Sequence, residues 1–143
     1  MNNSAEGLKP GDELPPLAIL PVDRMMLARF GCASGDFNPI HLDLDFARRA
    51  GMPDVFAHGM LGMAWLGRML TAWIPQGRLR RFDVRFQGVT HLGNAITCRG
   101  RIVDVPIVEG ERCARIEVSN TNQFGQIKIL GEALVSLDGG CPA

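Results

Sequence analysis

The stretch that decides the fold runs from residue 34 to residue 73 and reads SGDFNPIHLDLDFARRAGMPDVFAHGMLGMAWLGRMLTAW. It holds two of the three histidines and both tryptophans of the chain. A polar loop, Ser34 to His41, comes first, and a long apolar segment begins near His58. The loop offers groups that can move protons and the apolar segment offers a core, so this stretch is where a site and a fold should meet.

The loop contains a carboxylate, Asp36, and an imidazole, His41, separated by five positions. On a regular helix that spacing would put them about 140° apart, on different faces. The backbone cannot stay helical here, because Gly35 tolerates unusual dihedral angles and Pro39 pushes Asn38 towards extended geometry. The segment should therefore curl and turn both side chains towards one point, where they could act on a water molecule as a general acid/base pair.

A second interpretation of the same loop is a surface turn. Gly-Asp and Asn-Pro dipeptides are frequent in turns, and Asp43 is placed to cap a following helix. An isolated dipeptide of this kind would favour the turn. The complete set Gly-Asp-x-Asn-Pro-x-His is much more specific, and it favours the acid/base interpretation.

The apolar segment predicts a helix from Ala57 to Trp73 that is apolar around most of its circumference, which is typical of a buried helix. It is too short and too interrupted by glycine to predict a membrane span. Gly59 falls in the first turn, where amide N–H groups lack partners and the helix dipole is positive. It could hold a developing negative charge there; the alternative is that Gly59 only permits close packing and that His58 is a capping or core histidine.

The composition predicts one ordinary globular domain. The chain has 143 residues, 46% of them apolar and 21% charged, with a formal net charge of +0. Such a balance gives no general field for nucleic acid or for an acidic membrane surface. The first residues lack the apolar core of a secretory signal, and the four cysteines show no C-x-x-C pair, so we expect reduced thiols in a cytoplasmic protein.

The rest of the chain predicts short helices and then strands. Helices are expected at residues 24–32 and 43–50, and strands at residues 79–86, 95–105, 112–120 and 126–137. Successive strands joined by short turns predict an antiparallel meander. One buried helix ahead of four strands predicts an α+β fold with the sheet wrapped on the helix. Residues 1–8 are expected to be mobile, and residues 138–143 to form a tail.

Three segments together resemble a known family. GDFNPIH at 35–41, Phe46-Ala47, and AHGML at 57–61 are similar to the MaoC-like (R)-specific enoyl-CoA hydratases and dehydratases. The match is nearly complete from residue 30 to residue 47 and looser to about residue 137. The resemblance implies a single hot-dog domain across 1–143, an antiparallel sheet around a long central helix, and a homodimer.

The resemblance also implies a reaction, the reversible hydration of trans-2-enoyl thioesters to (R)-3-hydroxyacyl thioesters. Asp36 and His41 match the pair that holds and activates water, and Asn38 matches a residue that orients it. The Gly59 backbone N–H matches the donor to the thioester oxygen. No cofactor and no metal are implied; the thioester, on coenzyme A or an acyl carrier protein, is the substrate.

Further residues are candidates for contacts with that substrate. A local basic cluster, Arg78, Arg80, Arg81 and Arg85, is best explained as a solvated strand face; the alternative is contact with carrier phosphates. On that alternative Arg85 joins His58 as a candidate substrate-binding residue. Phe56, Met63 and Trp65 could line an acyl tunnel, but we expect them to fill the core.

Two other functions stay open. Hot-dog thioesterases also bind acyl-CoA and hydrolyse the thioester with a carboxylate; the Asp36/His41 pair with Asn38 favours hydration instead. A non-catalytic acyl-thioester-binding subunit of a heteromeric dehydratase is the other, and the presence of both catalytic side chains argues against it. One departure from the family is the turn His91-Leu92-Gly93-Asn94, where members often carry Pro-Gly-Asp.

Overall fold

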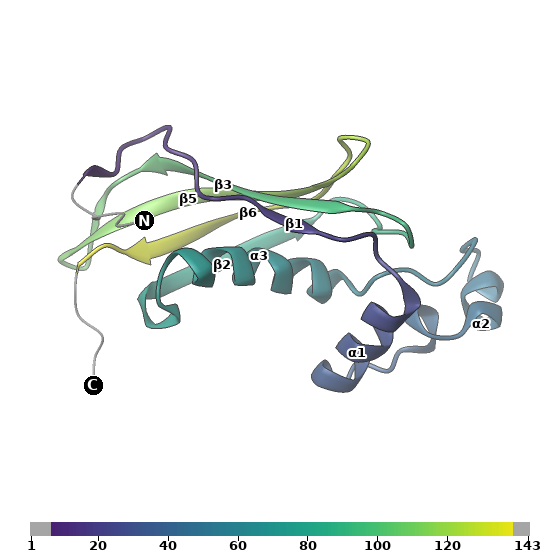
Figure 1. The fold of residues 1–143 in the computed structure, drawn as a ribbon. Helices are drawn as coiled ribbons and strands as arrows, with labels where there is room; N and C mark the ends of the chain where they lie inside the picture. Colours follow the sequence, from purple (N-terminus) through teal and green to yellow (C-terminus); the bar gives the residue numbers. More distant parts are fainter. Residues whose placement is uncertain (1–6, 139–143) are drawn as a thin grey trace.

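The apolar segment forms helix α3, Gly59–Trp73, and an antiparallel sheet curves over it (Figure 1). The computed structural model describes residues 7–138 of the chain. Six residues of α3 are buried against the sheet: Leu61, Gly62, Trp65, Leu66, Met69 and Leu70. The helix contacts four of the strands, so the core lies between the concave face of the sheet and α3. This is the hot-dog arrangement that the sequence predicts.

The sheet has five strands in the order β1-β3-β5-β6-β2, and a short β4 pairs with β5. All pairs are antiparallel. The bounds are β1 Leu17–Ile19, β2 Leu79–Phe86, β3 Ile96–Asp104, β4 Ile107–Val108, β5 Glu111–Asn122 and β6 Ile127–Ser136.

The prediction of a simple meander is wrong for one strand. The strands β3, β5 and β6 do follow each other through the sheet, but β2 pairs with β6 at the far side. The connection between β2 and β3 does not turn back as a hairpin. It passes the segment ahead of α3 instead, where Ala57 N–H donates to Thr90 O over 2.9 Å and Phe56 forms an isolated bridge with His91. Alternation along a strand reports which face is buried and not which strand lies beside it.

The side chains of β2 alternate between a partly buried inner face and an exposed outer face. A register shift between Leu79 and Arg81 lets Leu79 share the inner face with Phe82 and Val84, all three partly buried. Phe86 follows on that face, but 53% of it is exposed. Its ring lies beside the first residue of α3, and it becomes part of the site described below.

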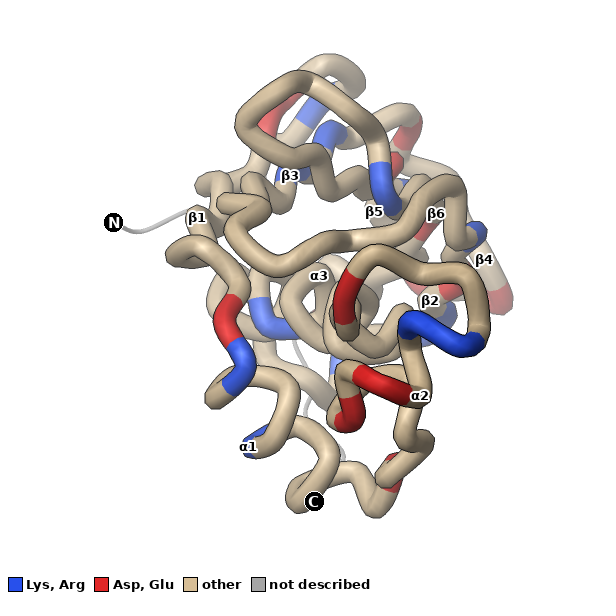
Figure 2. Tube along the Cα trace, turned by 90° about the vertical axis from the view of Figure 1, so that its right-hand side faces the viewer, with Lys and Arg blue, Asp and Glu red and all other residues tan. Residues whose placement is uncertain are grey.

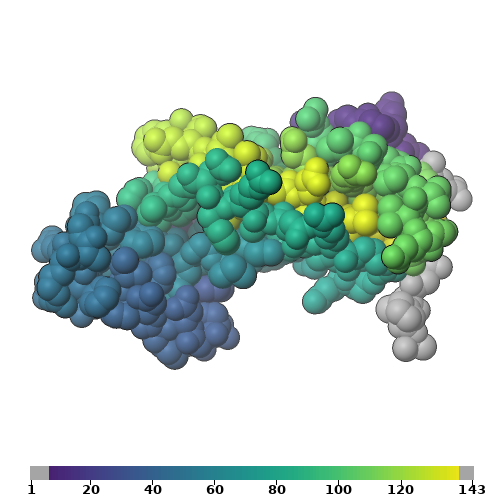
Figure 3. Space-filling view, turned by 180° about the vertical axis from the view of Figure 1, so that it is seen from behind, coloured from purple at the N-terminus to yellow at the C-terminus, as the bar shows by residue number. Residues whose placement is uncertain are grey.

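Two short helices lie beside the N-terminal end of α3. Helix α1, Arg24–Ser34, begins at Asp23, whose carboxylate accepts a hydrogen bond from Met26 N–H. Helix α2, Leu44–Arg49, begins at Asp43, which accepts from Phe46 N–H. The sequence predicts the cap at Asp43. Figure 3 shows this part of the chain as a blue lobe projecting from one end of the molecule.

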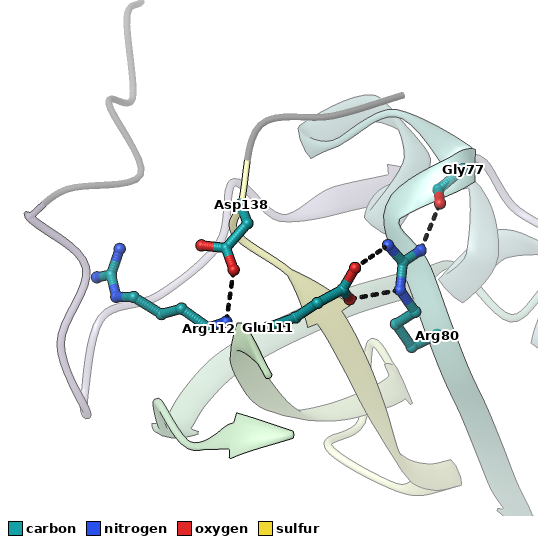
Figure 4. A network of polar contacts seen from close by, with 5 residues as sticks. All are labelled: Gly77, Arg80, Glu111, Arg112 and Asp138. Atoms are coloured by element: carbon teal, nitrogen blue, oxygen red, sulfur yellow. Dashed lines mark hydrogen bonds and ion pairs between the residues drawn. The ribbon is translucent and has the colours of Figure 1, made fainter. Parts of the chain in front are cut away.

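At the end of the sheet far from the lobe, a polar network joins neighbouring strands (Figure 4). Arg80 makes two hydrogen bonds to the carboxylate of Glu111, of 2.8 and 3.0 Å, and a third to Gly77 O. Asp138 accepts from Arg112 N–H over 2.7 Å. These contacts connect β2, β5 and the end of β6 far from the lobe.

The described residues exclude most of both termini and include three of the four cysteines. Residues 1–6 and 139–143 lie outside the described residues, and with them most of the two expected end segments; Leu8 packs against the core. Cys32, Cys98 and Cys113 are free thiols, as expected. Within residues 7–138, no helix is long and apolar enough to cross a membrane.

Candidate active site

The loop after α1 curls as its sequence predicts. Gly35 has φ +75°, and its N–H closes α1 by donating to Gly31 O over 2.9 Å. The carboxylate of Asp36 then accepts from Asn38 N–H over 3.2 Å. The side-chain oxygen of Asn38 accepts from Ile40 N–H over 3.1 Å and so caps a single 3-10 turn, η2, Pro39–His41. Asn38 therefore shapes the loop that carries both Asp36 and His41.

His41 is held by the backbone through one ring nitrogen. Its Nδ1 lies 2.8 Å from Phe56 O, which can only accept, so Nδ1 carries the proton. Nε2 is left with a lone pair that can take a proton from water. Burial lowers the pKa of His41 below its ordinary value of 6.5, and His58 lowers it further; the Phe56 carbonyl and Asp36 oppose the shift. The imidazole is thus neutral and basic at neutral pH.

His58 precedes α3 as its N-cap and is only 2% exposed. Its Nε2 donates to the backbone oxygen of Asp36 over 3.1 Å. Its ring lies 4.0 Å from the ring of His41 and 4.9 Å from that of Phe30, measured between centroids. Its Nδ1 has no hydrogen-bond partner among the described residues. His58 therefore joins the catalytic loop to the start of α3, and it is the core histidine that was weighed as an alternative.

Asp36, His41 and His58 form one cluster, here called the acid/base cluster. One nitrogen or oxygen from each lies within 4.8 Å of the others. Three such ligands could hold a metal ion, but two of the ring nitrogens already donate to backbone carbonyls. What the cluster offers directly is a carboxylate and a neutral imidazole that can share one water molecule. That the reaction needs no metal or cofactor stays a prediction.

The first cavity lies at the N-terminus of α3 and has a volume of about 340 Å³. Gly59 lines it, and the amide groups of the first helical turn have no acceptor within the helix. A Cβ on Gly59 would lie 3.1 Å from the ring of Phe86. The cavity is lined by Phe56, Ala57, His58, Gly59, Gly62, Phe86, Gln87, Gly88, Val89, Thr90 and Ile129.

The second cavity, of about 510 Å³, has Asp36 in its wall. The remainder of the wall is mostly apolar and runs along α3: Phe30, Ser34, Met60, Met63, Ala64, Gly67 and Phe82. The acid/base cluster therefore contributes His58 to one cavity and Asp36 to the other. If the reactive centre of a long molecule lies at the acid/base cluster, the second cavity offers apolar space for the part that extends past Asp36.

Some candidate residues are not brought to the cluster. Arg85 alternates with Val84 and lies on the outer face of the sheet, in a hollow with Glu117 and Glu132. In the basic cluster, Arg80 pairs with Glu111 and Arg81 with Asp83. The solvated-face interpretation therefore describes these arginines best. Figure 2, which views the molecule from the lobe end, shows charged positions mainly around its periphery.

We expected Phe56, Met63 and Trp65 to fill the core, and this is confirmed for Trp65 alone of the three. Trp65 is 7% exposed and belongs to the core. Phe56 and Met63 are only partly buried, and they line the first and second cavity respectively.

Sequence reasoning missed two groups. One is the Phe56 carbonyl, which orients His41; a backbone oxygen carries no residue-specific signal. The other is Lys128, which is only 6% exposed in the last strand and lies behind the first cavity. A lysine among alternating strand residues is normally taken as solvated, and no pattern marks this one as buried.

Comparisons with known proteins agree with the fold. Residues 8–123 match the family described as MaoC like domain. The (R)-specific enoyl-CoA hydratase of Aeromonas caviae is 27% identical over 113 residues, covering 78% of this chain and 83% of that protein. The unliganded R-hydratase PhaJ1 from Pseudomonas aeruginosa superposes with a TM-score of 0.82 at 24% identity, covering 93% of this chain and 84% of the other.

Other relatives are much longer than this chain. The fatty acid synthase beta subunit TOXC of Cochliobolus carbonum is 30% identical over 106 residues, which are 72% of this chain but 5% of that protein. The chain likewise spans 25% of the 3-hydroxyacyl-thioester dehydratase X of Mycobacterium tuberculosis. The match to the family nevertheless covers most of the described fold and includes every residue of the acid/base cluster. The chain belongs to the MaoC-like dehydratase domain family, with a hot-dog fold.

Proposed function

We propose that this protein is a hydro-lyase that reversibly hydrates trans-2-enoyl thioesters to (R)-3-hydroxyacyl thioesters. The observation that carries the proposal is the convergence of the Asp36 carboxylate and the His41 imidazole within one cluster, with the His41 ring held through Nδ1 by the Phe56 carbonyl. Gly59, at the start of α3, follows directly after His58 of that cluster. A proton acceptor next to an oxyanion donor is what addition of water to an unsaturated thioester requires.

In the proposed mechanism, Asp36 and His41 hold one water molecule. As its oxygen bonds to C3, the pair accepts a water proton and the C2–C3 π electrons move towards the thioester oxygen. The Gly59 N–H stabilises the enolate that forms there. The pair then returns a proton to C2 on the same face, so that the sum is one water added. The reverse sequence is dehydration.

The substrate class and the assembly belong to the same proposal. The relative from Aeromonas caviae is named an (R)-specific enoyl-CoA hydratase, and the tomato relative FERN is named a 3-hydroxyacyl-[acyl-carrier-protein] dehydratase. We therefore propose an acyl thioester of coenzyme A or an acyl carrier protein as substrate. We also propose a homodimer, because β2 leaves one sheet edge unpaired in the single chain.

The test follows the loss of enoyl-thioester absorbance with crotonyl-CoA and a longer trans-2-enoyl-CoA, with thiol release assayed in parallel. The wild type should consume the enoyl group without releasing thiol. Asp36→Asn keeps the size of the side chain but removes its charge, and it should lower the rate by about 10²–10⁴-fold. Thermal unfolding of the variant at the wild-type temperature serves as the control for folding.

Other outcomes would contradict the proposal. Thiol release by the wild type would assign the chain to the thioesterases. Binding of the thioester without turnover, unchanged in Asp36→Asn, would make it a binding subunit.

A further inference from the structure

Lys128 is a buried cation for which the proposed reaction has no use. It belongs to β6 at a point where the pairing with β5 is irregular: Asn120 pairs with Ile129 and Thr121 with Ile127, so Lys128 has no partner residue across the ladder. Only 6% of the residue is exposed. Lysine is rarely buried to this extent unless its charge is paired.

The charge of Lys128 is not paired within the described residues. Its Nζ makes one hydrogen bond, of 3.2 Å, to the side-chain oxygen of Gln126. That oxygen also accepts from Asn122, over 2.8 Å. Among residues 7–138, no carboxylate oxygen comes within 4.0 Å of the ammonium. An ammonium shielded from water with a single neutral acceptor is costly, and an anion beside it would offset that cost.

The position of the ammonium relates it to the first cavity. Nζ lies 3.9 Å from the point that a Cβ on Gly88 would occupy, and Gly88 lines the cavity. The glycine leaves no side chain between the ammonium and the cavity wall. Gly59, which starts α3, lines the same cavity, so the positive end of the helix and Gly88, the residue beside which the ammonium lies, border one space.

We propose that Lys128 forms an anion subsite of the first cavity and binds an oxygen of a phosphate or carboxylate group on the bound thioester. The choice of a thioester rests on the proposed function; the subsite itself rests on the unpaired cation and the cavity. The anion has two sources, a phosphate of the carrier arm or a carboxylate on the acyl chain.

The test measures binding without turnover, by calorimetry, with three probes: coenzyme A, 4′-phosphopantetheine and pantetheine. Lys128→Met keeps the apolar stem and removes the charge. It should weaken binding of the two phosphorylated probes about tenfold or more and leave that of pantetheine unchanged, since a hydrogen bond to a charged group is lost. Lys128→Arg keeps the charge and should retain most of the affinity.

Gln126→Glu gives a second, independent variant. It places a carboxylate where Gln126 now meets the ammonium, so the cation becomes paired inside the protein. This variant should fold at least as well as the wild type, and it should lose affinity for the same probes as Lys128→Met. It keeps the inference testable even where Lys128→Met does not fold.

A fourth probe separates the two sources of the anion. If Lys128→Met weakens binding only of an acyl-CoA that carries a carboxylate at the far end of its acyl chain, the subsite stands and its anion is the acyl carboxylate. Equal weakening for all probes, pantetheine included, or no change for any of them would overturn the inference. A protein that binds in this pattern but hydrates nothing would keep the subsite and lose the proposed function.

Discussion

At the scale of single residues, the two histidines of the acid/base cluster have different tasks. His41 donates a hydrogen bond from Nδ1–H to the Phe56 carbonyl, which leaves Nε2 unprotonated. His58 donates a hydrogen bond from Nε2–H to the Asp36 carbonyl, and its Nδ1 is buried without a partner among the described residues. The first is the residue that we propose exchanges protons, whereas the second ties the loop to α3.

The pH dependence of the reaction should follow His41. Its pKa is lowered below 6.5, chiefly by burial. In the proposed mechanism the base is the neutral imidazole of His41. Activity is therefore present above the pKa of His41 and is lost as the pH falls through that value. The acidic limb of kcat/KM for hydration should therefore have its midpoint below pH 6.5. A midpoint above that value, in a protein shown to stay folded across the range, would contradict the assignment of His41 as the base.

Two substitutions at His58 separate its hydrogen bond from its packing. His58→Phe keeps a ring between His41 and Phe30 but cannot donate to Asp36 O. His58→Gln keeps a donor but loses the ring. Because the hydrogen bond holds the loop, we expect His58→Phe to lower kcat about tenfold or more and His58→Gln to lose less. Equal kcat values for both variants, at equal KM and equal stability, would show that the hydrogen bond does not position the site.

How much of the site could be predicted is clearest at this scale. Gly35 and Pro39 exclude a helix, which lets the loop curl and bring Asp36 and His41 together. The contact between His58 and the Asp36 carbonyl depends on where α3 packs, which no local pattern contains. The sequence left His58 as either a substrate contact or a capping or core histidine; the structure gives it a backbone partner, and it also lies in the wall of the first cavity.

At the scale of elements, glycines show where close packing is required and where it is not. Gly67, in α3, has room for a methyl group: a Cβ there would lie 3.6 Å from the ring of Phe82, an ordinary contact. Gly131, in β6, is different, because a Cβ would overlap the Asp83 carbonyl and lie 2.9 Å from the Val84 Cα. Both obstacles are backbone of β2, which cannot move without disturbing the ladder.

These two glycines predict opposite effects on stability. Gly67→Ala should raise the free energy of unfolding by about 1 kcal/mol, because alanine favours the helix. Gly131→Ala should lower it by about 3 kcal/mol, since the overlap must displace β2. Urea unfolding followed by circular dichroism measures both. A loss of stability in Gly67→Ala, or none in Gly131→Ala, would contradict the packing described here.

The elements themselves were predicted better than their order. Asp23 and Asp43 fix two helix starts because a carboxylate caps free amides, and the bounds of β2 follow from its alternation. The neighbour of β2 could not be predicted. It depends on the path of residues 87–95, in which Thr90 and His91 pair with the segment ahead of α3.

At the scale of the whole molecule, one edge of the sheet stands open. β2 pairs with β6 on one side only, while β1, at the other edge, is three residues long. An open edge of this length invites a second strand. We expect light scattering to give twice the monomer mass, and the unfolding temperature to fall on dilution, because dissociation is linked to unfolding. A monomer at micromolar concentration with a dilution-independent unfolding temperature would contradict the homodimer.

The pairing of β2 with β6 also has a consequence for how the protein is made. On the ribosome, residues 79–86 emerge long before residues 127–136, so β2 lacks its partner strand until β6 has also emerged. Until then the apolar face of β2 is exposed or is bound by a chaperone. The residues of the acid/base cluster precede both strands in the chain, but the sheet that supports the cluster cannot close before β6 is available. Activity should therefore appear in the nascent protein only after β6 has left the ribosome.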